Sequence, residues 1–161
     1  MNLTELKELV GIPKKHQEEV TFAAPHHKWS KVKELLDQKT DYPRTKPRQI
    51  WWCAIGLNIG QEQSCDDGYE RPVLVLKAFG GIFWGLPITS SDPAGTKAKN
   101  PLYFKIDGMP YINERGKQKV LHGFVAIHQL RVFDGRRLKR KILKIDVETF
   151  EKITAKIKDI L

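Results

Sequence analysis

Arg71 stands where a long polar segment gives way to the apolar run 72–76. A guanidinium is permanently charged, and its planar fork matches the oxygens of a phosphate group. This position therefore suits an arginine that binds a nucleic-acid backbone. It equally suits an arginine that opens a strand and pairs with Glu70 or Asp67, and the residues alone leave both interpretations open.

Hydroxyl groups gather at the end of another apolar run. Thr89 and Ser90 follow residues 82–88 and precede a Ser-Asp-Pro sequence. Hydroxyls at a strand end can orient a phosphate or a sugar hydroxyl, and they can also form a turn with the Asp-Pro pair. The sequence allows both uses.

A histidine lies near the end of a third run. His128 directly precedes Gln129. Imidazole is the usual proton carrier near neutral pH, so His128 is a candidate acid or base, and the simpler interpretation is a polar residue at a strand end. His122 lies six residues earlier, and the two would share a face if one strand ran unbroken through both.

The polar segment 56–70 separates two apolar runs and spans 15 residues, which is long for a hairpin loop. Long loops on a rigid barrel often bind ligands, although a compact surface loop is the plainer alternative. Its glycines do not follow the Gly-x-Gly-x-x-Gly pattern that binds phosphates. We favour a binding role for this segment.

Other familiar catalytic patterns are missing from the sequence. It contains no Gly-x-Ser-x-Gly elbow, no carboxylate cluster with metal spacing and no Cys/His spacing typical of zinc. The two cysteines, Cys53 and Cys65, fit a reducing compartment. We therefore expect neither a metal nor a cofactor.

The chain is strongly basic, with a net charge of +9 and five cations within residues 136–141. Such a surplus favours an acidic partner, either nucleic acid or an acidic protein segment. The alternative is a solvated surface, or a strand edge that charge protects against aggregation. The sequence has no stretch near the ~20 apolar residues of a membrane helix and no visible signal peptide, so we expect a cytoplasmic protein.

Short apolar runs predict a strand-rich middle to the chain. Loops of Gly, Asp and Asn separate these runs without intervening helical patterns, which is typical of an antiparallel barrel. Pro87 suggests an edge strand or a bulge. The expected strands are residues 50–55, 72–76, 82–89, 102–106 and 120–127, with 130–133 continuing the last.

Helical patterns flank the strands. An N-terminal helix is expected from the spacing of Leu3, Leu6, Leu9 and Val10. Pro25 opens a second helix, whose apolar face is formed by Trp29, Val32, Leu35 and Leu36. Asp146 caps a C-terminal helix with an apolar stripe of Val147, Phe150, Ile153, Ile157 and Ile160. We divide the chain into a helical extension and linker, 1–47, and a barrel with its C-terminal helix, 48–161.

Five strings then occur in a specific order. They are RQIWW at 48–52, IGLNIGQE at 55–62, RPVLVL at 71–76, LPITS at 86–90, and QLRVFD at 129–134 followed by Arg137-Leu138. Together they resemble the PemK/MazF family of type II toxin–antitoxin endoribonuclease toxins. The resemblance covers 48 to 161 and leaves residues 1–47 outside. Two departures are Arg48-Gln49 in place of an opening Gly-Asp/Glu, and Ala126 and His128 in place of an Arg-x-Asp pair.

The resemblance implies an SH3-like antiparallel barrel that forms a homodimer. It implies sequence-selective cleavage of single-stranded RNA, such as mRNA, by 2′-hydroxyl attack without a metal. It also implies neutralisation by an acidic antitoxin protein.

The family's catalytic residues map onto Arg71 and Thr89, with His128 as the candidate acid or base. The RNA-binding residues that the resemblance implies are Asn58, Gln61, Ser90, Gln129 and Arg131. Two alternatives stay open: a non-catalytic toxin of the same fold that binds a protein such as gyrase, and a basic RNA- or DNA-binding module.

Overall fold

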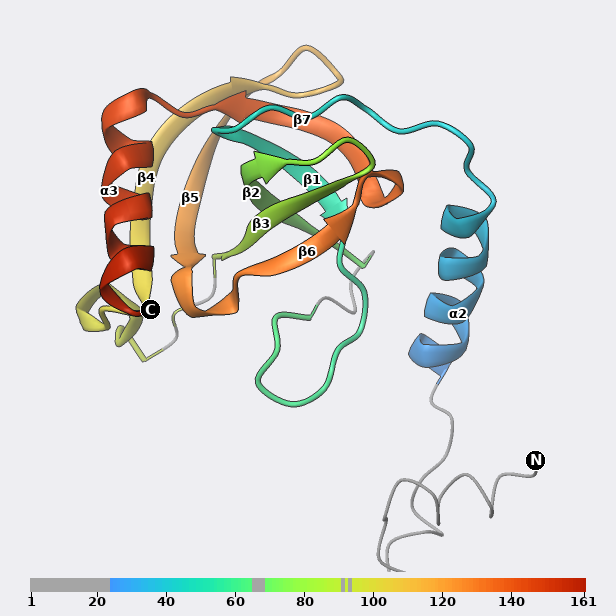
Figure 1. Ribbon diagram of the computed structural model, residues 1–161, viewed down its shortest axis with the longest axis horizontal. Coiled ribbons are helices and arrows are strands. Elements are labelled where there is room, and N and C mark those ends of the chain that lie inside the picture. The colour runs from blue at the N-terminus through green and yellow to red at the C-terminus, as the bar shows by residue number, and fades with distance from the viewer. Residues whose placement is uncertain (1–23, 65–68, 91, 93) are drawn as a thin grey trace, which may run out of the picture.

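The computed structural model describes residues 24–64, 69–90, 92 and 94–161 (Figure 1). The expected helix around Leu3 to Val10 and the residue Cys65 lie outside the described residues. No helix within the described ranges has the length and apolar character needed to cross a membrane.

A single antiparallel sheet curls into a half-barrel over the described part of the chain, in the order β4-β5-β3-β2-β1-β7, with β6 paired to β3. The mainly β, barrel-like fold expected from the sequence is confirmed. The strands are β1 (Gln49–Ala54), β2 (Glu70–Ala78), β3 (Ile82–Thr89), β4 (Tyr103–Ile112), β5 (Gln118–Ala126), β6 (Arg131–Asp134) and β7 (Leu138–Lys144).

Two strand expectations need correction. Residues 130–133 do not continue β5, because a 3-10 turn at Ile127–Gln129 intervenes and β6 pairs with β3 instead. Pro87 does not mark an edge, since β3 has partners on both sides. The cation-rich segment after residue 137 forms β7, which pairs with β1 at one edge of the sheet, so the strand edge that the sequence offered as one interpretation is present.

The core lies inside the curled sheet and beneath α3 (Val147–Asp159). Ile50, Leu74 and Leu86, from three adjacent strands, are fully buried there. A second cluster contains Phe83 and Phe133, whose rings stack with centroids 5.4 Å apart. Cys53 belongs to this cluster, and its burial raises the pKa of its thiol to about 12.

The C-terminal helix begins as expected, because the Asp146 carboxylate accepts a hydrogen bond of 2.8 Å from the Thr149 backbone N–H. Ile153 and Ile157 are buried against the barrel. The residues at the two ends of the expected apolar stripe are not buried: Val147 is 53% exposed and Ile160 is 41% exposed.

The helix α2 (Ala24–Asp37) lies on the opposite side of the barrel from α3 (Figure 1). Trp29 and Leu36 are buried, with Val32 packed beside them. Leu35 is 65% exposed, so it does not belong to the apolar face expected for this helix. Positions 29, 32 and 36 follow the helical repeat, whereas position 35 is turned toward solvent.

Candidate functional site

A groove opens where β3 changes partners. β3 pairs with β2 as far as Val73–Pro87, and its last residues pair with β5 instead, at Ile88–Val125 and Thr89–Phe124. The start of β2 therefore faces a hollow of about 850 Å³, which we call the Arg71 groove. Its lining includes Trp52, Glu70, Arg71, Ser90, Tyr111 and His122.

The Arg71 guanidinium is half-buried at this groove and contacts the loop 55–69 between β1 and β2. Its Nε and Nη2 donate to the Ser64 carbonyl at 3.1 and 2.5 Å. Glu70, one of the two partners that the sequence allowed, pairs instead with Arg140, whose Nη1 lies 3.4 Å from the Glu70 carboxylate. A neutral carbonyl does not compensate a positive charge, and Asp67, the other partner that the sequence allowed, lies outside the described residues. The ion pairs found in the described ranges do not include Arg71.

The hydroxyl residues lie at the same end of the sheet. Ser90 lines the Arg71 groove, and Thr89 directly before it is only 3% exposed. The pairing of β2 with β3 ends at Val73–Pro87, and Arg71 and Thr89 each lie two residues beyond that pair. The strand ends thus bring Arg71, Thr89 and Ser90 to one region, while their catalytic and RNA-binding roles stay predictions.

An imidazole, that of His122, lines the same groove. His122 Nδ1 lies 2.5 Å from the Asp107 carboxylate and 3.2 Å from the Gly108 backbone N–H. Hydrogen bonds first from Lys105 and then from His122 lower the pKa of the Asp107 carboxyl below its usual range. These two contacts hold the orientation of the imidazole: Nδ1 donates to Asp107 in one tautomer and accepts from the Gly108 N–H in the other. Sequence reasoning did not select His122 as a site residue.

His128 does not share a face with His122, because β5 ends at Ala126 and His128 belongs to the following 3-10 turn. His128 Nδ1 lies 3.2 Å from the Leu102 carbonyl, and its ring meets Tyr103 edge-on with centroids 5.1 Å apart. It lines a separate hollow of about 330 Å³ with Gln61, Glu62, Gln129, Leu130 and Arg131.

Gln129 fastens the β1–β2 loop to the barrel. Its Oε1 accepts a bond of 2.6 Å from the Gln63 backbone N–H, and its Nε2 donates to the Gln61 carbonyl at 3.0 Å. Asn58 acts within the loop, where its Nδ2 donates to the Gln63 carbonyl at 2.6 Å. Two of the residues expected to bind RNA therefore shape this loop, and their contact with RNA stays a prediction.

Arg131 is half-buried beside the second hollow. Its guanidinium lies over the Phe133 ring, 4.9 Å from the centroid. Burial, and after it the charge of Arg137, lowers the pKa of Arg131. Arg131 therefore places a cation beside Gln61 and Gln129, and the negative charge of Glu62, which lines the same hollow, acts in the opposite sense on its pKa.

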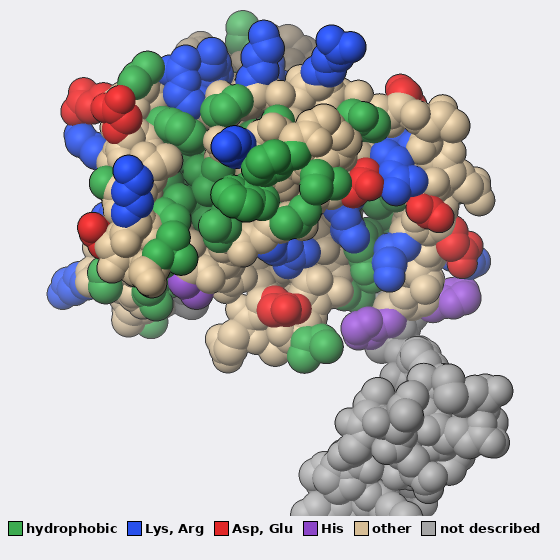
Figure 2. Space-filling view, viewed as in Figure 1, with side chains coloured by type: hydrophobic (Ala, Val, Ile, Leu, Met, Phe, Trp, Pro, Cys, Tyr) green, Lys and Arg blue, Asp and Glu red, His purple; other side chains and the backbone are tan. Residues whose placement is uncertain are grey.

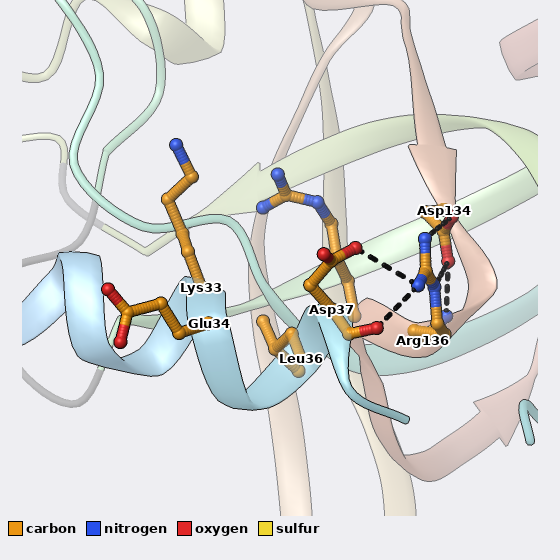
Figure 3. Close-up of a pocket in the computed structure, with 7 residues that line it drawn as sticks. Lys33, Glu34, Leu36, Asp37, Asp134 and Arg136 are labelled. Atoms are coloured by element: carbon orange, nitrogen blue, oxygen red, sulfur yellow. Dashed lines mark hydrogen bonds and ion pairs between the residues drawn. The ribbon is translucent and has the colours of Figure 1, made fainter. Parts of the chain in front are cut away.

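The cations of residues 136–141 are largely tied into the fold. Arg136 pairs with Asp134 at 3.0 Å and with Asp37 of α2 at 3.2 Å, beside a hollow of about 340 Å³ (Figure 3). Arg137 Nη1 donates to the Ala54 carbonyl at 2.9 Å. Arg140 lies over Trp52, with 5.1 Å to the ring centroid. These arginines join elements of the protein, in addition to adding positive charge.

Residues 46–161 match a family model described as the PemK-like, MazF-like toxin of type II toxin–antitoxin systems. Comparison with curated protein sequences returns no match. The helix α2 lies before the matched residues.

Solved structures resemble the same part of the chain. MazF from Deinococcus radiodurans (Form-I) has a TM-score of 0.50 and 18% identity, over 74% of this chain and 96% of that one. The Mycobacterium tuberculosis toxin MazF-mt6 has a TM-score of 0.47 and 15% identity, over 70% and 94%. An endoribonuclease in complex with its cognate antitoxin, from a mycobacterial species, has a TM-score of 0.47 and 12% identity, over 72% and 93%. The likeness to the first of these concerns the fold.

Proposed function

This chain belongs to the family of PemK-like, MazF-like toxins of type II toxin–antitoxin systems, and we propose on that premise that it is an endoribonuclease. It cleaves single-stranded RNA at selected sequences, without a metal ion. The observation that carries the proposal is Arg71, a guanidinium without a carboxylate partner among the described residues, facing a groove of about 850 Å³.

The proposed reaction needs only groups of the RNA and the protein. The 2′-oxygen attacks the adjacent phosphorus, the bond from phosphorus to the 5′-oxygen breaks, and the products are a 2′,3′-cyclic phosphate and a 5′-hydroxyl. Negative charge grows on the phosphoryl oxygens as the 2′-oxygen approaches, and Arg71 stabilises it. Thr89 or Ser90 orients the phosphate from the end of β3.

Arg71 can bind RNA while it keeps its contact with Ser64. A guanidinium has five N–H donors, and only Nε and Nη2 donate to the Ser64 carbonyl. The remaining N–H groups are available for a phosphate oxygen, whose charge makes the hydrogen bond strong.

Proton transfer requires a base for the 2′-hydroxyl and an acid for the leaving 5′-oxygen. His122 shares the groove with Arg71, and Asp107 fixes its Nδ1. His128 lines the other hollow. We assign one of the proton transfers to His122, and His128 remains the alternative that the family resemblance suggested.

An apolar face on the outside of the sheet supports a homodimer. Phe79, Ile82 and Trp84 are each 45% exposed, and Val132, opposite Trp84, is 55% exposed. Figure 2 shows hydrophobic side chains gathered over β3 and β6. Adjoining exposed apolar residues of this size mark an interaction surface. We call it the β3–β6 face, and we propose that a second copy of the chain covers it around a two-fold axis.

An acidic antitoxin is the other partner that the family implies. The net charge of +9 favours association with an acidic segment. Such a segment would compete with RNA for the cationic surface around Arg71 and Arg131.

The test is cleavage of a mixed-sequence RNA in excess chelator, with mapping of both new ends. We expect a 2′,3′-cyclic phosphate and a 5′-hydroxyl at a restricted set of sequences. Cleavage that requires added magnesium would contradict the mechanism. Salt-dependent RNA binding without cleavage would favour a binding module, and capture of a topoisomerase without cleavage would favour a non-catalytic toxin.

A further inference from the structure

We propose that the helix α2, which lies outside the family match, braces the β1–β2 loop, and that Trp29 is the positioning residue through which it does so. The consequence for RNA cleavage rests on the proposed function. The mechanical claim, that Trp29 holds the loop, does not depend on it.

Trp29 lies against both ends of the loop. Gly56, at the first end, has a φ of +73°, and a Cβ built on it would lie 2.0 Å from the Trp29 ring. Tyr69, at the second end, has its ring centroid 5.4 Å from that of Trp29. The Gly56 backbone N–H donates to the Tyr69 carbonyl at 3.1 Å and closes the loop. The indole thus occupies the space that the glycine leaves open, and it is 8% exposed.

A continuous set of hydrogen bonds leads from Gly56 to Arg71. The Ser64 hydroxyl donates to the Gly56 carbonyl at 3.2 Å and accepts from the Asn58 backbone N–H at 3.1 Å. The carbonyl of the same Ser64 accepts both hydrogen bonds from Arg71. The position of Gly56 therefore sets that of Ser64, and Ser64 sets where the guanidinium rests.

The helix itself is anchored to the barrel at several points. Near its C-terminal end Asp37 pairs with Arg136 (Figure 3), and Lys39 donates to the Arg136 carbonyl at 3.1 Å. Arg137 lies over the Trp29 ring, 5.8 Å from the centroid, while it donates to Ala54, the last residue of β1. A helix held in this way transfers the rigidity of the barrel to the loop.

This arrangement pre-organises the guanidinium. A loop held at both ends samples fewer conformations, so less order must be gained when RNA enters the groove. Loss of the indole leaves a cavity beside Gly56 and Tyr69 and loosens both ends of the loop together.

The experiment compares Trp29→Ala with Leu35→Ala in the full chain. Leu35 lies on the same helix but is 65% exposed. We expect Trp29→Ala to raise hydrogen exchange of the backbone amides of residues 56–64, and Leu35→Ala to leave it unchanged. RNA cleavage by Trp29→Ala should fall about tenfold, since small displacements of a catalytic group are costly. Should Trp29→Ala fail to fold, Trp29→Phe replaces it and should give a smaller change of the same sign.

A double-mutant cycle tests the contact itself. Gly56→Ala places a methyl group where the Trp29 indole lies. It should therefore lower the free energy of unfolding much more in the wild type than in the Trp29→Ala background. The strain of the positive φ is the same in both backgrounds. Two results would contradict the proposal that Trp29 holds the loop. One is additive effects of the two substitutions on the free energy of unfolding, and the other is an unchanged rate of amide hydrogen exchange at residues 56–64 in Trp29→Ala. If the wild type does not cleave RNA, the proposed function is wrong. Hydrogen exchange and the double-mutant cycle still test whether Trp29 holds the loop.

Discussion

The two histidines near the site differ in what their imidazoles contact. His122 lines the groove of Arg71 and is oriented by Asp107, whereas His128 lines the second hollow. We expect His122→Gln to lower the RNA cleavage rate by about 100-fold or more, because a positioned acid or base contributes on that order. His128→Gln should change the rate much less. Single-turnover rates at saturating RNA measure both, and the reverse ranking would transfer the role to His128.

Site residues could be predicted from the sequence where a local motif marks them, and not where they depend on contacts between distant residues. The string RPVLVL points to Arg71 directly. The Asp107–His122 contact joins residues 15 positions apart through the pairing of β4 and β5. Asp107-Gly108 and Pro110, which are unfavourable in strands, hid that pairing: the sequence pattern ends the strand at residue 106, and the structure extends it to Ile112.

The elements were predictable where their boundaries carry strong signals. β3 matches its expected limits, since Gly80-Gly81 precede it and a Ser-Asp-Pro sequence follows. β7 was not among the expected strands because three consecutive cations, residues 139–141, interrupt its apolar pattern, although Leu138 and Ile142 are buried. The contact of Trp29 with Gly56 was not predictable, because it depends on where α2 docks.

The cap of α3 gives a pH dependence at the scale of an element. Hydrogen bonds from the Thr149 backbone N–H and hydroxyl lower the pKa of the Asp146 carboxyl in the folded state. Asp146 therefore stabilises the folded state above its unfolded pKa of about 3.9, and this contribution is lost as the pH falls toward the lower folded value.

We expect Asp146→Asn to lower the urea midpoint of unfolding at pH 7, with the difference from wild type shrinking at pH 3. Asp159→Asn is the control, since this carboxylate stands at the end of α3, where negative charge is not stabilising. A difference that grows at pH 3 would contradict the assignment of the cap.

At the scale of the whole molecule, we propose that the β3–β6 face is the interface of a homodimer. Val132→Glu places a charge in the middle of this face and should convert the dimer to a monomer, because an unpaired buried charge is strongly unfavourable. Val147→Glu is a matched control, with the same substitution at a position of similar exposure on α3: 53% against 55%. Sedimentation equilibrium measures the masses. A monomeric wild type, or a dimeric Val132→Glu variant, would contradict the proposed interface.

The central claim is that Arg71 makes this barrel a metal-independent ribonuclease, and it concerns the assembled molecule with its groove intact. The most direct measurement is the RNA cleavage rate, in excess chelator, of wild type, Arg71→Ala and Arg44→Ala. Arg44 is an exposed arginine in the linker before β1, so its variant controls for the loss of one charge. We expect Arg71→Ala to be slower by about 100- to 1,000-fold with an unchanged near-ultraviolet circular dichroism spectrum, and Arg44→Ala to match wild type. Equal rates for wild type and Arg71→Ala would contradict the account.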